Sequence, residues 1–135
     1  MSRGLRNFNP LNIRKGGDTF QGERLPSSDA DFKQFKTMAW GYRAAIVTLA
    51  TYNILGFNTI EEIVKRWAPP VENETEAYIK AVEKGSKIKR NKVLTRMDGN
   101  AYIAIVAAMS AVENGVPAIL VNVEEGFKLQ LRIGR

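Results

Sequence analysis

The chain of 135 residues contains no histidine and no cysteine, so any acid–base chemistry must come from other side chains. Their absence excludes Ser-His-Asp triads, histidine-ligated zinc, thiolate nucleophiles and disulfide bonds. Aspartate, glutamate, lysine and tyrosine remain as proton donors and acceptors. Because a glycosidase needs only carboxylates, the residue inventory is compatible with glycoside cleavage.

Glu113 has the sequence surroundings of a glycosidase acid. It ends an apolar segment and is followed by Asn114 and Gly115, a pattern typical of a helix C-terminus. Partial burial and the negative end of a helix both favour the protonated form of a carboxyl group, which is the form that protonates a leaving oxygen. The alternative interpretation is an ordinary polar residue before a glycine cap.

Apolar residues recur at helical spacing in four segments, and these segments must position the acid. The pattern predicts helices over residues 37–55, 59–68, 73–84 and 98–113. Capping boxes are expected for Thr59 with Glu62 and for Asn73 with Glu76, and Asp98 is expected to cap the fourth helix.

The two ends of the chain have different patterns. Residues 1–18 are rich in turn formers and predict an ordered loop, whereas short aromatic pieces in residues 19–36 predict a small irregular β-hairpin. Alternating apolar residues from Phe127 to Ile133 predict a late strand. Length and pattern together predict one mainly α (α+β) domain over residues 1–135.

A wider pattern extends over nearly the whole chain. It is carried by residues 3–14, Phe20-Gln21-Gly22-Glu23, residues 29–35 leading into Gly41-Tyr42-Arg43-Ala44, and residues 66–70 with 72–79. Together these segments resemble a family of small phage and mobile-element proteins often labelled virion structural proteins. Members of that family are similar to the lysozyme and lytic-transglycosylase fold. The resemblance implies a lysozyme-like domain that cleaves peptidoglycan as a muramidase, glucosaminidase or lytic transglycosylase.

A second resemblance is to the flagellar-type glucosaminidases. Residues 7–14 are similar to a loop of those enzymes, and Glu113-Asn114-Gly115 is similar to the Glu-x-Gly that ends their catalytic helix. In those enzymes the helix precedes the loop, whereas here the loop comes first. The order is that of a circular permutation.

These resemblances imply roles for individual residues. Glu113 would be the general acid and Glu23 the second carboxylate, which activates a water or stabilises the transition state. A lytic transglycosylase would need Glu113 alone, because the substrate's own hydroxyl attacks. The residues expected to bind the glycan are Asn9, Asn12, Gln21, Asn73 and Tyr78. No metal ion and no cofactor are expected.

Each of these residues also has a structural interpretation. Glu23 could be a solvated loop carboxylate, Asn73 a helix cap and Tyr78 a core side chain. Trp67 lies on an apolar stripe and is expected to pack in the core. Asp29 and Asp31 are expected to cap turns.

The net charge of +6 favours polyanionic partners. No apolar run approaches the ~20 residues of a membrane span, and residues 1–14 lack a signal-peptide core. We therefore expect delivery to the cell wall or periplasm by a phage particle or by a secretion or conjugation machine, with peptidoglycan and proteins of that machine as partners. One alternative is a catalytically inactive, glycan-binding virion protein. Another is a basic nucleic-acid-binding protein, which the lack of a helix-turn-helix or basic-aromatic pattern disfavours.

Overall fold

The computed structural model describes residues 1–68 and 71–132. In this part of the chain it has six helices and one two-stranded antiparallel sheet. In chain order the elements are α1 (Arg3–Arg6), β1 (Glu23–Arg24), β2 (Gln34–Phe35), α2 (Met38–Ile54), α3 (Ile60–Trp67), α4 (Glu72–Ser86), α5 (Gly99–Asn114) and α6 (Leu120–Arg132). The predicted mainly α fold with a small β lobe is confirmed.

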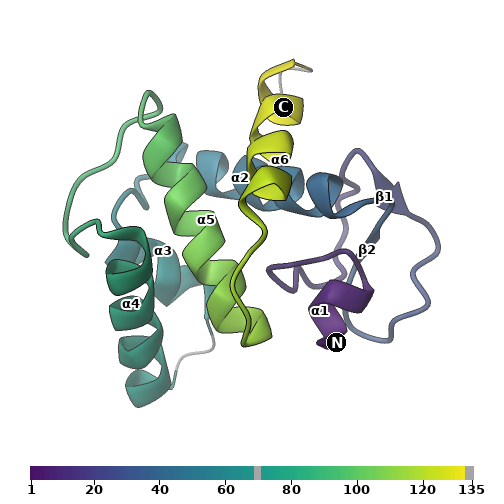
Figure 1. Cartoon of the computed structure of the whole chain (residues 1–135), viewed down its shortest axis with the longest axis horizontal. Helices are drawn as coiled ribbons and strands as arrows, with labels where there is room; N and C mark the ends of the chain where they lie inside the picture. Colours follow the sequence, from purple (N-terminus) through teal and green to yellow (C-terminus); the bar gives the residue numbers. More distant parts are fainter. Residues whose placement is uncertain (69–70, 133–135) are drawn as a thin grey trace.

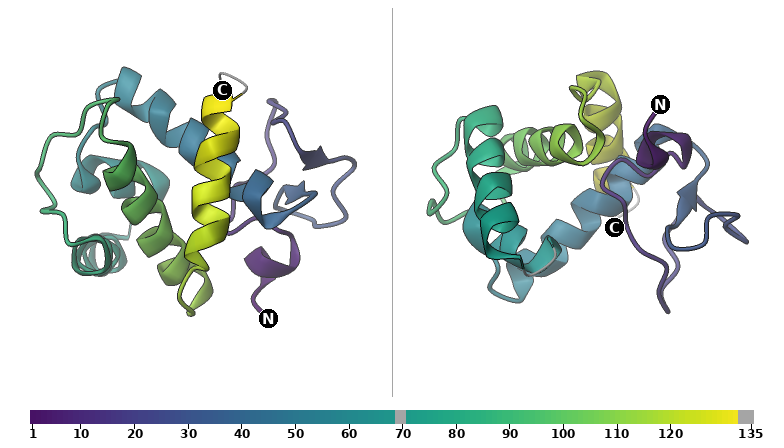
Figure 2. Two further views of the ribbon diagram at one scale, coloured as in Figure 1. Left: turned by 45° about the horizontal axis from the view of Figure 1, so that its top comes forward. Right: turned by 90° about the horizontal axis from the view of Figure 1, so that it is seen from below.

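Helix α2 is the central element of the molecule (Figure 1). Helices α3 and α4 lie at one end of the molecule, and α1 and the β-hairpin lie at the other. Helix α5 runs from the first end to α1, and α6 crosses α2, as the rotated views also show (Figure 2). The buried side chains of α2 to α6, together with Leu11 and Leu94, form one continuous core. The β lobe and the N-terminal segment therefore adjoin a helical body that carries most of the apolar burial.

The surroundings of α2 explain its central place. Thr37 caps it, since the hydroxyl accepts a hydrogen bond from the backbone N–H of Trp40. Residues 41–46 are all buried, so this helix is apolar around most of its circumference. After α2 ends, Gly56 adopts φ 95°, a backbone conformation that favours glycine.

Helix α3 begins at the predicted cap. Thr59 accepts from the N–H of Glu62, and the Glu62 carboxylate accepts from the N–H of Asn58 and from the Thr59 hydroxyl. Trp67 ends the helix, packs against the core and donates its ring N–H to the Leu11 carbonyl at 3.3 Å. The predicted stop at Pro69-Pro70 lies outside the described residues.

The prediction that Asn73 and Glu76 form a capping box for α4 is wrong. The helix begins at Glu72, so Asn73 lies inside its first turn, and the residue at the N-cap position is Val71, whose side chain makes no capping bond. The Glu76 carboxylate instead forms an ion pair with the guanidinium of Arg90. The tertiary fold thus brings the Arg90 guanidinium to the Glu76 carboxylate, which pairs with it and not with a backbone N–H at the start of the helix. The helix ends at Ser86 with Lys87 in the left-handed conformation.

The basic loop of residues 87–98, between α4 and α5, is anchored to the helices by specific contacts. The Arg90 guanidinium also pairs with the Glu61 carboxylate at 2.7 Å, and the backbone N–H of Arg90 donates to the Glu83 carboxylate at 2.8 Å. Leu94 is buried in the core. Asp98 precedes α5 but accepts from Thr95 within the loop, so the predicted side-chain cap is absent.

Residues 120–132 form helix α6, so the predicted late strand is wrong for the described residues. Val123 is fully buried. Gly126 lies so close to α2 that an added Cβ would be 2.8 Å from the backbone nitrogen of Arg43. Phe127 packs against the core one turn after Val123. A short run of alternating apolar residues fits both periods, and packing on α2 selects the helix.

The first 36 residues agree with the predicted loop and hairpin, with one addition. Residues 3–6 form the short helix α1, capped by Ser2. The hairpin pairs Glu23 with Phe35 and Arg24 with Gln34. Leu11 is fully buried, so the N-terminal segment is packed against the body as expected.

Candidate active site

Glu113 lies in the last turn of α5, where three segments of the chain meet. It is half-buried, and both carboxylate oxygens accept hydrogen bonds. The Asn12 amide donates to Oε1 at 2.8 Å, and the Tyr78 hydroxyl donates to Oε2 at 3.0 Å. Three of the residues named from the sequence are thus brought together. We call Glu113, Asn12 and Tyr78 the Glu113 cluster.

Tyr78 is a buried donor on helix α4. Burial, followed by the negative charge of Glu113 and the hydrogen bond to it, raises the pKa of Tyr78 well above its usual range. The phenol therefore stays protonated and keeps donating to the carboxylate. Its ring packs in the core while its hydroxyl reaches the cluster, which is an arrangement that an amphipathic side chain allows.

Asn12 reaches the cluster because of an unusual backbone conformation. Its φ is 55°, in the left-handed region that asparagine tolerates better than most residues. Its Oδ1 atom is buried and has no hydrogen-bond partner among the described residues. That oxygen is the one unsatisfied acceptor beside Glu113 in this part of the structure.

Asn114, which the sequence analysis did not single out, ties the end of α5 to the N-terminal segment. Its amide donates to the Pro10 carbonyl at 2.8 Å and to the Ser110 carbonyl at 2.9 Å. Its Oδ1 accepts from the Ser2 hydroxyl at 2.7 Å. These bonds hold residues 2 and 10 against the helix end and so place Asn12 beside Glu113. The sequence feature that could have indicated this role is the position of Asn114, a second polar residue between Glu113 and Gly115.

Glu23 does not join the cluster. It lies in the β lobe, with both oxygens 3.2 Å from the Lys33 ammonium and with the Phe20 N–H donating to Oε1 at 3.0 Å. The side chains of Glu23 and Lys33 are only 4% and 5% exposed. Lys33 also donates to the Asp18 carbonyl at 2.7 Å. The carboxylate is therefore a buried, paired structural group, and not the solvated loop residue of the alternative interpretation.

The remaining predicted glycan contacts are scattered. Asn9 is fully buried, and its amide bonds to Ile13 and Lys33 brace the N-terminal segment against the β lobe. Gln21 is exposed in the β lobe, and no described hydrogen bond connects it to Glu113. Asn73 lies in the first turn of α4, and its side chain lies outside what the structure describes.

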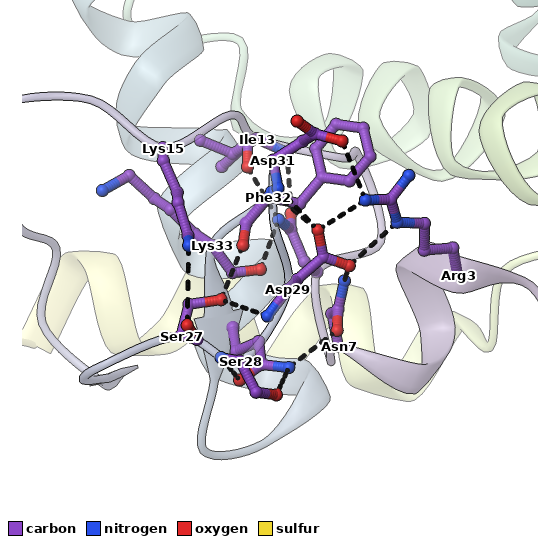
Figure 3. Close-up of polar contacts among 12 residues, drawn as sticks. Arg3, Asn7, Ile13, Lys15, Ser27, Ser28, Asp29, Asp31, Phe32 and Lys33 are labelled. Carbon is purple, nitrogen blue, oxygen red and sulfur yellow. Dashed lines mark hydrogen bonds and ion pairs between the residues drawn. The ribbon is translucent and has the colours of Figure 1, made fainter.

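Asp29 is the most highly bonded carboxylate in the β lobe (Figure 3). It caps its own turn by accepting from the N–H groups of Asp31 and Phe32, as expected of a loop aspartate. It also accepts two bonds from Arg3, at 2.7 and 2.8 Å, and one from Asn7. Arg3, followed by Asn7 and the backbone donors, holds the pKa of Asp29 far below its ordinary value. Asp29 thus clamps the turn of the β lobe to α1.

We expect replacement of Asp29 by asparagine to lower the melting temperature at neutral pH by several degrees, because the ion pair with Arg3 is lost. A folded-state pKa below the unfolded value means that the stabilisation is present above the unfolded pKa and is lost as the pH falls below it. Wild type should therefore lose stability on acidification from about pH 5 downward, and the variant should lose less.

Differential scanning calorimetry at several pH values measures both effects. Asp18→Asn, at an exposed carboxylate with no described side-chain partner, is the control and should follow the wild-type pH profile. Equal acid sensitivity of wild type and Asp29→Asn would show that Asp29 does not clamp the lobe.

Two further features of the described residues concern membrane spans and metal ligands. No helix in the described ranges is long and apolar enough to cross a membrane. Within residues 1–68 and 71–132, no three His, Cys, Asp or Glu residues are arranged to hold a metal ion.

Fold and site together define a small, mainly helical protein with a β lobe and a hydrogen-bonded glutamate at a helix end. No family model matches the chain. Protein P5 of Pseudoalteromonas phage PM2 is 40% identical to it in an alignment of 132 residues, and the match covers 94% of the chain and 81% of protein P5. The chain belongs to the same family as this phage protein, and the predicted relationship to phage proteins is confirmed to that extent.

Proposed function

We propose that the chain is a component of a phage particle that binds peptidoglycan glycan at the Glu113 cluster through a lysozyme-like domain. The identity to a phage protein along almost the whole chain supports the particle role. A helical body, a β lobe and a glutamate at the end of an apolar helix support the lysozyme-like comparison.

The observation that carries the glycan-binding part is the convergence of two donors, Asn12 and Tyr78, on the half-buried carboxylate of Glu113. A carboxylate and an amide, held rigidly by packed elements, are groups that hydrogen-bond to sugar hydroxyls. The unsatisfied Asn12 oxygen is buried beside Gly4 and is not exposed to a ligand, so the half-buried Glu113 carboxylate is the group of the cluster that a sugar hydroxyl would reach. The cluster thereby combines fixed polar groups with the rigid scaffold that a ligand site requires.

A second candidate function is cleavage by a single acid, as in a lytic transglycosylase. The burial of Glu23 against Lys33 favours this candidate over two-carboxylate hydrolysis, because a paired and buried carboxylate cannot readily activate water. Glu113 would then protonate the leaving oxygen, and the substrate's own hydroxyl would attack.

Sedimentation with purified peptidoglycan sacculi tests the proposal. Wild type should pellet with sacculi, and we expect Glu113→Gln to bind about tenfold more weakly, since the amide offers its neighbours one acceptor oxygen in place of two. Glu124→Gln, an exposed carboxylate on α6, is the matched control and should bind as wild type does.

The same samples distinguish the two candidates. Binding without soluble products supports a glycan-binding particle protein, whereas soluble products with 1,6-anhydro ends, absent for folded Glu113→Gln, support single-acid cleavage. New reducing ends would indicate hydrolysis. A wild type that neither pellets nor releases products overturns the peptidoglycan proposal. The particle role is tested separately, by whether the chain co-purifies with density-gradient-purified particles of the phage that encodes it.

A further inference from the structure

A groove of about 560 Å³ opens between α2, α5 and α6, at the opposite end of α5 from Glu113. In Figure 1, the first turn of α5 and the last turns of α6 rise on the same side of α2, whereas the other end of α5 lies beside α1. Glu113 is fourteen positions after Gly99 along the same α-helix, which corresponds to a distance of about 21 Å. The groove is therefore separate from the candidate active site.

The floor of the groove is apolar. It is formed by Ile46 and Ala50 of α2, Tyr102 of α5 and Phe127 of α6. The tip of the Phe127 ring packs against Gly99, where an added Cβ would be 2.6 Å from the Cζ atom. The polar groups of one wall are already satisfied, because Asn53 donates to the Tyr102 hydroxyl at 2.8 Å and to the Leu94 carbonyl at 2.9 Å.

The rim of the groove is apolar and strongly exposed. Ile54 is 57% exposed, Leu131 is 62% exposed and Met97 is 90% exposed. A small molecule in the groove would leave these rim side chains in water, whereas a helix laid along it would cover them. Exposed apolar rims around a groove are typical of protein-docking sites, and methionine is common on such surfaces.

Charge decides which helix fits. Arg96 lines the groove and is exposed, and among the described residues it has no acidic partner. None of the described residues that line the groove is acidic, and the whole chain carries a net charge of +6. An occupant with a carboxylate placed beside Arg96 is therefore complementary in charge, and one with a lysine there is repelled.

We infer that this groove docks an amphipathic helix of a partner protein, with its apolar face on Phe127 and Leu131 and a carboxylate paired with Arg96. The identification of that partner as another protein of a phage particle rests on the proposed function, whereas the groove chemistry does not. Docking at this end leaves the Glu113 cluster uncovered, so one chain can hold a partner and present the cluster at the same time.

Two designed helical peptides test the inference. They share one leucine-rich face and differ only in a glutamate or a lysine at its edge. In fluorescence anisotropy the glutamate peptide should bind wild type about tenfold more tightly than the lysine peptide. Arg96→Glu should reverse this preference, while Leu131→Ser should weaken the binding of both peptides.

Leu120→Ser is the matched control, because Leu120 is 53% exposed at the opposite end of α6 and outside the groove. It should leave peptide binding unchanged. Equal binding of the two peptides, no binding, or a preference that Arg96→Glu does not reverse would overturn the inference. Sedimentation velocity of wild type that shows dimers broken by Leu131→Ser would identify a second copy as the occupant and also overturn it.

Peptide binding and sacculus binding are separate readouts. The groove variants should pellet with sacculi as wild type does, and Glu113→Gln should bind the glutamate peptide normally. Failure of the peptide assay alone therefore rejects the groove, and failure of the sacculus assay alone rejects the glycan proposal.

Discussion

Replacing Gly41 by alanine is expected to destabilise the protein by about 3 kcal/mol, at the upper end of the range for overpacked cores. A Cβ at this position in α2 would lie 2.1 Å from the Phe8 carbonyl oxygen and 2.7 Å from Pro10. The carbonyl is backbone, so relief requires the whole N-terminal segment to move away from α2. That movement would also disturb the Asn12 side of the Glu113 cluster.

The sign of this prediction is the opposite of the helix-propensity effect. Alanine normally stabilises a helix interior by about 1 kcal/mol relative to glycine. Urea unfolding measures the difference. Gly17→Ala is the control, because nothing lies within 4 Å of its added Cβ, and it should change stability by less than about 0.5 kcal/mol. A stabilised Gly41→Ala variant would mean that the N-terminal segment does not pack on α2.

Replacing Arg43 by methionine is expected to stabilise the protein by about 1–3 kcal/mol. Arg43 is 1% exposed on α2, and its Nε and Nη2 atoms are buried without a hydrogen-bond partner among the described residues. Burial lowers the pKa of Arg43 below its ordinary value, and no acidic group within residues 1–68 and 71–132 offsets this effect. Methionine keeps the approximate length of the side chain and removes a charge whose one described stabilising contact is a distant cation–π contact, 5.9 Å from the centre of the Trp40 ring.

Urea unfolding with an unchanged m-value is the measurement. Arg66→Met is the matched control, because the guanidinium of Arg66 lies over the rings of Tyr52 and Phe57 at 5.3 and 4.7 Å. Loss of these cation–π contacts should cost up to about 1 kcal/mol, so the two variants should change stability in opposite directions. A destabilised Arg43→Met variant would show that the guanidinium has an acceptor in solution.

Local patterns were sufficient to predict the helical body. The apolar spacing of residues 37–55 and 98–113 predicted α2 and α5 within a few residues, because a buried helix requires that spacing whatever it packs against. Thr59 with Glu62 predicted the start of α3 for a similar reason, since the capping bonds stay within a few residues. Four alternating residues near the C-terminus were too short a pattern to distinguish a strand from α6.

In the candidate site, the sequence indicated which residue types could do chemistry but not which of them meet. Lack of histidine and cysteine left carboxylates, and the helix-ending pattern indicated Glu113. Asn12 and Tyr78 are 101 and 35 residues away from it along the chain, and only the packing of the N-terminal segment and α4 on α5 brings them into contact.

Long-range contacts explain why Glu23 and Glu76 do not have the roles that their local sequence predicted. Glu23 forms a buried ion pair with Lys33. Glu76 forms an ion pair with Arg90 and not the predicted helix-capping bond. Composition and periodicity therefore determined the class of fold, the absence of histidine and thiol chemistry, and the helix end that carries Glu113. Which carboxylates are paired, buried or available depended on the tertiary fold, because an ion pair forms between side chains that meet in space, and local sequence does not encode that meeting.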